Sequence, residues 1–232
     1  MSIIAEKIEQ VVSQIKQFCE DSQRKPDDVT LLAVSKTRST DEIREAFHQG
    51  LRCFGENYVQ EAVEKIVALA DLPIEWHFIG PLQSNKTRQV AEAFSWVHSV
   101  DRLKIAKRLS EQRPANLPAL NICLQVNIDD EQSKSGCHPD EAIELARQIA
   151  ELPNLKLRGL MAIPAPTDDP EQQHRAFKAV SQLSEQLRLA GLPLDTLSMG
   201  MSSDLEAAIA EGSTMVRVGT ALFGSRPAKS VE

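Results

Sequence analysis

Hydrophobic positions along the chain follow two alternating periods, and these predict a repeating strand–helix architecture. Residues 3–19 place their apolar side chains on one helical face, which predicts an amphipathic helix at the N-terminus. The stretch 29–37 is apolar or β-branched at six of its first eight positions and predicts a strand buried on both faces. Ser39 and Glu42 then form a capping box that leads into a helix over residues 43–49.

The alternation continues to the end of the chain. Seven further strands are predicted over residues 52–56, 75–80, 96–101, 120–128, 156–163, 196–200 and 215–218. The helices between them are predicted over residues 58–70, 87–94, 103–112, 139–152, 171–190 and 205–211. Parallel strands with crossover helices predict one (β/α)8 TIM barrel domain over residues 1–232, with an extra N-terminal helix. An open doubly wound sheet is the alternative, but no G-x-G-x-x-G or P-loop follows a strand.

Composition and charge exclude several classes of protein. The net charge of −7, without a basic run, argues against a nucleic-acid partner. The N-terminus does not look like a signal peptide, and no apolar run has the ~20 residues that span a bilayer, so a cytoplasmic location is expected. The sequence shows no long apolar patch and no heptad repeat that would indicate a partner subunit, so we expect a monomer. Scattered cysteines and histidines without a C-x-x-C pair predict a reduced protein with no metal site.

Lys36 is the first candidate for chemistry because it ends the first predicted strand. A lysine at the edge of the low-dielectric core has a lowered pKa, and a neutral amine forms an imine with an aldehyde. A lysine that simply reaches into water is the alternative on this stretch alone.

The loops after the seventh and eighth strands are the second candidate. They are rich in Gly, Ser and Thr, which suits a phosphate site at this end of a barrel, although Ser202 or Ser203 also suits a helix cap. Arg217 lies in an apolar strand and needs a partner, which a structural salt bridge would also supply. Lysine, phosphate cradle and arginine together suggest pyridoxal 5′-phosphate (PLP), although a Schiff-base sugar-phosphate aldolase would use the same parts.

Six segments in chain order resemble one known family. Residues 76–86 (WHFIGPLQSNK) look like its signature, and residues 33–36 (AVSK), 54–61 (FGENYVQE), 159–161 (GLM), 198–202 (SMGMS) and 216–220 (VRVGT) accompany it. With these segments the chain resembles the PLP homeostasis proteins, also called YggS or PROSC proteins. The resemblance implies the barrel fold of the alanine racemase N-terminal domain.

The resemblance also implies roles for individual residues. Lys36 is implied to hold PLP as a Schiff base, and Arg217 to face the pyridine nitrogen. The implied phosphate-binding residues are Ser202, Gly219 and Thr220. The implied wall residues of the pocket are Asn57, Met161 and Ser198. His77 lies in the signature segment, and both a place beside the cofactor and a place in the core stay open for it.

The implied function is intracellular PLP homeostasis: buffering PLP, delivering it to apo-enzymes and influencing amino-acid balance, without established catalysis. A weak amino-acid racemase with Lys36 as its base is the alternative. In the related racemase the second base is a tyrosine from an additional domain, which this chain, ending at Glu232, is not expected to carry; its only tyrosine is Tyr58. Lys134, in a polar loop, is a further candidate that would capture PLP transiently.

Overall fold

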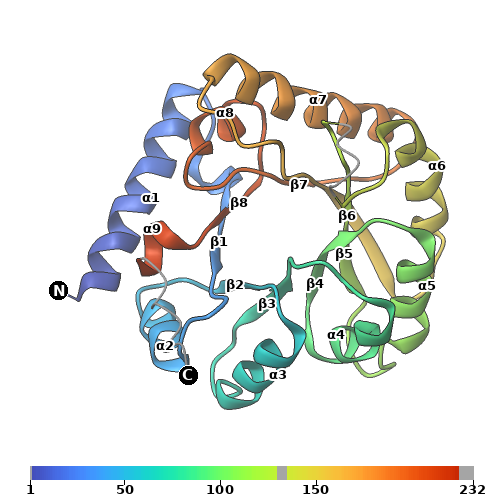
Figure 1. Cartoon of the computed structure of the whole chain (residues 1–232), viewed down its shortest axis with the longest axis horizontal. Helices are drawn as coiled ribbons and strands as arrows, with labels where there is room; N and C mark the ends of the chain where they lie inside the picture. Colours follow the sequence, from blue (N-terminus) through green and yellow to red (C-terminus); the bar gives the residue numbers. More distant parts are fainter. Residues whose placement is uncertain (1, 130–134, 225–232) are drawn as a thin grey trace, which may run out of the picture.

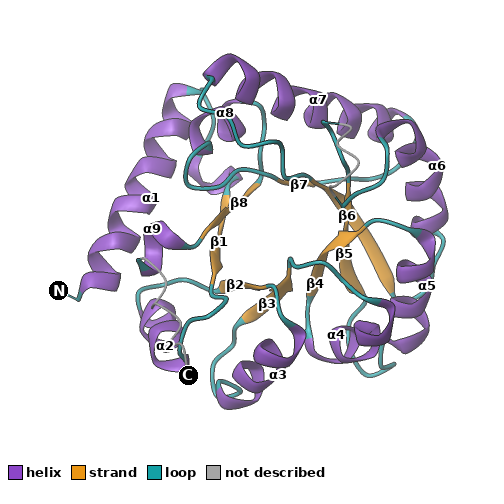
Figure 2. Ribbon diagram, in the orientation of Figure 1, coloured by secondary structure: helices purple, strands orange, loops and turns teal. Residues whose placement is uncertain are grey.

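The computed structural model describes residues 2–129 and 135–224, in which eight parallel strands close into a barrel in the order β1 to β8 (Figures 1 and 2). The predicted (β/α)8 barrel is confirmed. The strands are β1 (Thr30–Val34), β2 (Cys53–Glu56), β3 (Glu75–Phe78), β4 (Trp96–Val100), β5 (Leu120–Gln125), β6 (Leu155–Met161), β7 (Thr196–Ser198) and β8 (Met215–Val218).

Helices surround the barrel, as Figure 2 shows. They are α1 (Ile3–Asp21), α2 (Thr40–His48), α3 (Val59–Ala68), α4 (Thr87–Ala93), α5 (Leu103–Gln112), α6 (Pro139–Ala150), α7 (Pro170–Leu189), α8 (Leu205–Ala210) and α9 (Thr220–Phe223). Two short 3-10 turns, Pro26–Asp28 and Ser84–Lys86, precede β1 and α4. No helix in the described ranges combines the length and the apolar character needed to cross a bilayer.

The extra N-terminal helix is present and completes the ring of helices. Because α9 has only four residues, it covers little of the barrel next to β8 and β1. α1 packs there against α8, α9 and α2 (Figure 1). This amphipathic helix buries its apolar face, which is formed by Ala5, Ile8, Val11, Ile15 and Cys19.

The capping box at Ser39 forms as predicted, but the helix that it begins is longer than expected at its start. The hydroxyl of Ser39 accepts a hydrogen bond from the Glu42 N–H at 3.2 Å, and the Glu42 carboxylate accepts from the Ser39 N–H at 2.8 Å. α2 therefore starts at Thr40, directly after its cap. β1 ends at Val34, so Lys36 lies two residues past the strand.

Gly159 in β6 lies where two neighbouring strands come into close contact. A Cβ atom at this position would collide with the carbonyl oxygen of Thr196 in β7. The backbone cannot yield without disturbing the ladder in which Gly159 pairs with Thr196. Only glycine therefore fits this contact.

We expect Gly159→Ala to lower the free energy of unfolding by about 3 kcal/mol or more, at the upper end of the cost of overpacking. Gly50→Ala is the matched control, because Gly50 has a φ of 100° and no atom within 4 Å of the added Cβ. It should lose only about 1–2 kcal/mol, the cost of the left-handed conformation. Urea unfolding curves measure both, and equal losses would contradict the packing argument.

Candidate functional site

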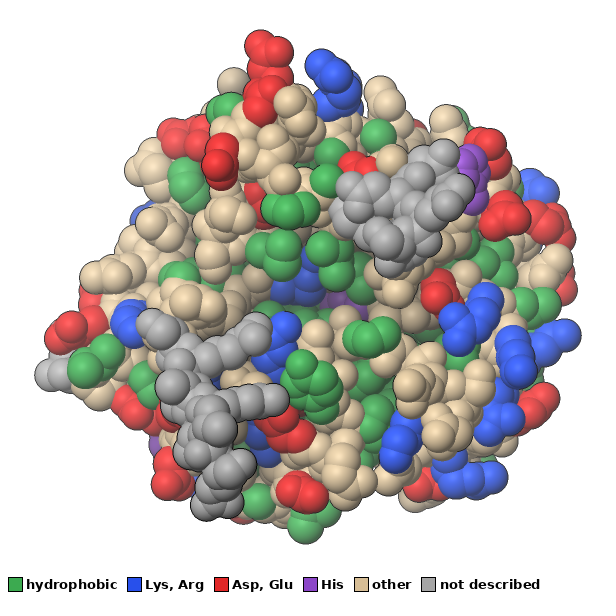
Figure 3. Space-filling view, viewed as in Figure 1, with side chains coloured by type: hydrophobic (Ala, Val, Ile, Leu, Met, Phe, Trp, Pro, Cys, Tyr) green, Lys and Arg blue, Asp and Glu red, His purple; other side chains and the backbone are tan. Residues whose placement is uncertain are grey.

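A cavity of about 370 Å³ lies at the carboxyl ends of the strands, where barrel enzymes place their chemistry. It is lined by Val34, Lys36, Asn57, Ile79, Ile163, Met201, Ser202, Ser203, Arg217, Gly219 and Thr220. In the view down the barrel, Lys or Arg atoms and His atoms lie at the centre of a hollow framed by hydrophobic side chains (Figure 3).

The structure brings six of the eight predicted site residues to this cavity. They are Lys36, Asn57, Ser202, Arg217, Gly219 and Thr220. Met161 and Ser198, predicted as wall residues, are buried in the barrel interior and do not line the cavity. Met161 packs with Trp96 and Cys123, whereas Ser198 contacts Arg217 from below. Lys134, the predicted loop lysine, lies outside the described residues.

Arg217 carries a charge into the barrel interior. Its Nη1 donates to the carbonyl oxygen and the hydroxyl of Ser198, at 2.5 and 2.8 Å, and its Nη2 donates to the carbonyl oxygen of Ala162 at 2.9 Å. Burial lowers the pKa of Arg217 to about 10, so the guanidinium remains charged at neutral pH. Since these bonds go to neutral oxygens, the site suits an electron-rich or anionic ligand.

Polar backbone and small side chains face the same cavity from the last two loops. Ser202 and Ser203 precede α8, and Gly219 caps α9. The first N–H groups of a helix have no intrahelical partner, which favours anions near them. Asn57, after β2, adds a buried Oδ1 that has no hydrogen-bond partner in the described part of the chain.

Lys36 is half-buried, and a network of buried charges holds the backbone on either side of it. Lys65 Nζ, from α3, donates to the carbonyl oxygen of Ser35 at 2.7 Å and to Glu56 Oε1 at 2.9 Å. It also pairs with Glu61 Oε1 at 2.5 Å. The same Glu61 oxygen accepts the N–H of Thr37 at 2.5 Å.

The backbone at Thr37 is strained. Its φ of 65° is in the left-handed region, where β-branched residues are outliers. Such strain persists only where surrounding contacts hold it, and it is common at functional sites. The bonds from Lys65 and Glu61 supply that restraint next to Lys36.

Sequence reasoning missed the role of Lys65 because its partners come from three segments. Glu61 and Lys65 are four residues apart on one helix, which is the available signal. The contacts with Glu56 and with the Ser35 carbonyl appear only in the folded barrel.

His77 lies in the barrel interior, away from the cavity, and belongs to a buried polar column. The Glu75 carboxylate accepts from His77 Nε2 at 2.9 Å, and His77 Nδ1 lies 2.9 Å from His98 Nε2. His98 Nδ1 lies 2.8 Å from the Ser198 hydroxyl, which accepts from Arg217. Burial lowers the pKa of both histidines, so each ring is neutral and donates from one nitrogen only.

Known proteins are similar to this chain in fold and in sequence. The model of the alanine racemase N-terminal domain family matches residues 5–227. A relative from Pseudomonas aeruginosa named pyridoxal phosphate homeostasis protein is 61% identical over 226 residues, covering 97% of each chain. A relative of the same name from Escherichia coli is 53% identical, covering 97% of this chain and 98% of its own. The structure of PipY from Synechococcus elongatus with PLP bound matches with a TM-score of 0.85 at 39% identity, covering 95% of this chain and 100% of that one.

Fold and site together define a (β/α)8 barrel of the alanine racemase N-terminal type, with a polar cavity at its carboxyl rim. Within that class, the chain belongs to the family of pyridoxal phosphate homeostasis proteins. The resemblance seen in the sequence is thereby confirmed.

We expect Lys65→Met to lower the free energy of unfolding by about 3 kcal/mol at pH 7, because it leaves the Glu56 carboxylate buried without its cation. Burial already raises the pKa of Glu56 above its ordinary value of 4.5. A carboxyl group whose pKa is raised in the folded protein favours folding most while it is protonated in both states, below pH 4.5. This contribution to the free energy of unfolding is lost as the pH rises through the pKa of the folded state. The loss in Lys65→Met should therefore grow with pH.

Unfolding by urea between pH 4 and pH 8 measures this dependence. The double variant Lys65→Met/Glu56→Gln is the control, because the neutral amide removes the stranded charge and should recover most of the loss at pH 8. A loss in Lys65→Met that is independent of pH would contradict the role of the Glu56 charge.

Proposed function

We propose that this chain binds PLP at the carboxyl rim of the barrel and serves PLP homeostasis by buffering PLP and delivering it to apo-enzymes. One observation carries the proposal: a half-buried lysine and a buried arginine cation line a single cavity, together with the Ser- and Gly-containing loops after β7 and β8. An aldehyde, a ring nitrogen and a phosphate are the three groups of one small molecule that such a cavity would take.

Each part of the cavity receives a part of the cofactor. Lys36 holds the aldehyde carbon as a Schiff base. Ser202, Gly219 and Thr220 hold the phosphate, and Arg217 faces the pyridine nitrogen. The unpartnered Oδ1 of Asn57 supports a polar ligand here. Ser198 acts indirectly, because it positions Arg217, and Met161 packs with Trp96 and Cys123 in the barrel interior.

The relatives support the homeostasis role. The curated proteins from P. aeruginosa and E. coli carry that name over nearly the full length of this chain, and PipY is described with PLP bound. They make a sugar-phosphate aldolase the weaker interpretation. We further propose that the protein acts in the cytoplasm as a monomer.

Two features of the cavity bear on the choice between a carrier and a racemase. PLP supplies an electron-withdrawing ring when bound, and an arginine at the ring nitrogen makes that ring a weaker electron sink than a carboxylic acid would. Tyr58, which precedes α3, is exposed and lines a neighbouring cavity with Gln83 and Lys86. Its position gives no support to a second base facing Lys36.

Absorbance of the purified protein before and after borohydride tests the binding mode. We expect a yellow chromophore that borohydride bleaches, and Lys36→Ala should lose it because no amine remains at that position. Lys86→Ala is the matched control and should keep the chromophore, since Lys86 lines the neighbouring cavity only. A wild-type protein that stays colourless with added PLP would overturn the proposal, as would an unchanged chromophore in Lys36→Ala.

Transfer kinetics test the delivery role. The PLP-loaded protein is mixed with increasing amounts of an apo-enzyme, and recovered activity is followed while a separate trap for free PLP gives the release rate. We expect the rate of apo-enzyme reconstitution to exceed the rate at which PLP is released into solution. It should also rise with apo-enzyme concentration, because handover occurs within a complex of the two proteins. A reconstitution rate equal to the release rate at every concentration would reduce the role to buffering.

The same assay on Lys134→Ala tests the proposed transient capture of PLP by this lysine. Unchanged transfer kinetics in the variant would contradict that role.

A further inference from the structure

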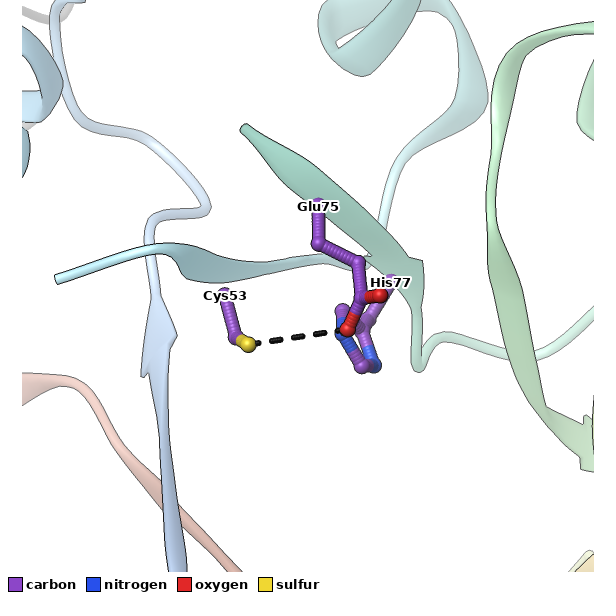
Figure 4. Close-up of side chains that lie close together, drawn as sticks. All are labelled: Cys53, Glu75 and His77. Carbon is purple, nitrogen blue, oxygen red and sulfur yellow. Dashed lines mark hydrogen bonds and ion pairs between the residues drawn. The ribbon is translucent and has the colours of Figure 1, made fainter. Parts of the chain in front are cut away.

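A second group of ligand-type side chains lies at the amino end of the barrel. Cys53 begins β2, and Glu75 and His77 are the first and third residues of β3 (Figure 4). The register pairs Cys53 with Glu75, and alternation places Glu75 and His77 on the same face. Among the described residues, these three bring their sulfur, oxygen and nitrogen ligand atoms within 4.8 Å of one another.

Two of the separations between these atoms can be compared with those around a zinc ion. Cys53 Sγ lies 3.6 Å from Glu75 Oε1, and this oxygen lies 2.9 Å from His77 Nε2. Around a tetrahedral zinc ion, a sulfur and an oxygen ligand are about 3.6 Å apart, and an oxygen and a nitrogen ligand about 3.4 Å. The sulfur–oxygen distance already has this value. A shift of about 0.5 Å by the half-exposed Glu75 carboxylate would bring the oxygen–nitrogen distance to its value as well.

The surroundings of His77 also suit a ligand. A histidine that binds metal through one nitrogen donates the N–H of the other to a fixed acceptor. His77 Nδ1 lies 2.9 Å from His98 Nε2, which would accept that N–H once a metal ion held His77 Nε2. Trp96 stacks on the His77 ring, with the ring centres 5.2 Å apart and the planes 11° from parallel, so the ring plane is fixed.

A cavity of about 520 Å³ gives access from solvent. Its wall includes the first residue of six strands, namely Thr30, Cys53, Glu75, Trp96, Thr196 and Met215. A water molecule from this cavity completes the fourth position of a three-ligand zinc site. The nearby Arg158 is neutralised by Asp195 at 2.9 Å, so its charge does not oppose a cation.

We propose that Cys53, Glu75 and His77 bind a zinc-class divalent ion, which joins β2 to β3 at the amino end of the barrel. A thiolate and an imidazole favour zinc over magnesium or calcium, which prefer oxygen ligands. Binding replaces the Cys53 S–H bond with a sulfur–metal bond, and the proton leaves to the buffer. The role is structural, because this end of a barrel serves stability.

Cysteine and histidine spacing did not reveal this site, and the sequence predicted no metal. The ligands come from two strands that the barrel makes neighbours, so they form no short motif. The site is spatially separate from the proposed PLP cavity, which lies at the other end of the strands.

Metal titration of the full-length, tag-free protein tests the proposal after treatment with a chelator. We expect calorimetry with zinc chloride to give one ion per chain and zinc to raise the Tm. Cobalt chloride should give the visible spectrum of a tetrahedral ion with a sulfur-to-metal band. Cys53→Ser and Glu75→Gln should each weaken zinc binding by more than about 100-fold, since loss of a ligand exceeds the cost of losing a supporting contact.

Cys137→Ser is the matched control, because this thiol follows β5 at the carboxyl end of the barrel and should leave zinc binding unchanged. Circular dichroism establishes that each variant is folded. Absence of zinc binding in the wild type, equal affinity in Cys53→Ser, or a cobalt spectrum without the sulfur band would each overturn the site. The borohydride-sensitive chromophore is measured separately, so failure here leaves the PLP proposal intact.

Discussion

Burial of the Arg217 guanidinium determines which ligand the carboxyl rim of the barrel can accept. Removing a full charge from water costs several kcal/mol unless other groups compensate. The carbonyl oxygens of Ser198 and Ala162, at the ends of β7 and β6, supply hydrogen bonds but no negative charge. The position of the cation is therefore set by two strand ends. The nearby Asp204 carboxylate offsets part of its charge, and a ligand in the cavity can offset more. In the proposed binding mode, the electron-rich ring nitrogen of PLP would do so without forming a buried salt bridge.

The backbone around Lys36, after the neighbouring strand β1, is held in a different way, by charges that compensate one another. Lys65 lies between Glu56 and Glu61, and its third bond goes to the Ser35 carbonyl. Together with the bond from the Thr37 N–H to Glu61, this network fixes the backbone on both sides of Lys36. A lysine that binds and releases an aldehyde needs a flexible side chain on a fixed backbone, and the strained Thr37 shows how firmly that backbone is held.

The sequence predicts well what depends on neighbouring residues. Alternation, apolar periodicity and the Ser39 cap are local, and they were sufficient for the barrel and its N-terminal helix. It predicts poorly what depends on which face of a strand end a side chain occupies. Met161 and Ser198 end β6 and β7, where a shift of one residue separates a cavity wall from the interior. The contacts of Lys65 with β2 required the closed barrel, so no local pattern contains them.

The two ends of the barrel are connected through its interior by the column from Glu75 through His77, His98 and Ser198 to Arg217. Because both histidines are neutral, each is a donor at one nitrogen and an acceptor at the other, so the column has a direction. With Glu75 as the acceptor at the amino end, the Ser198 hydroxyl donates to His98 and accepts from Arg217. A metal ion on His77 Nε2 would move the ring proton to Nδ1 and reverse that direction up to Ser198. The donor and acceptor roles along this column, as far as the Ser198 hydroxyl that accepts from Arg217, would therefore depend on what His77 Nε2 binds at the amino end of the barrel.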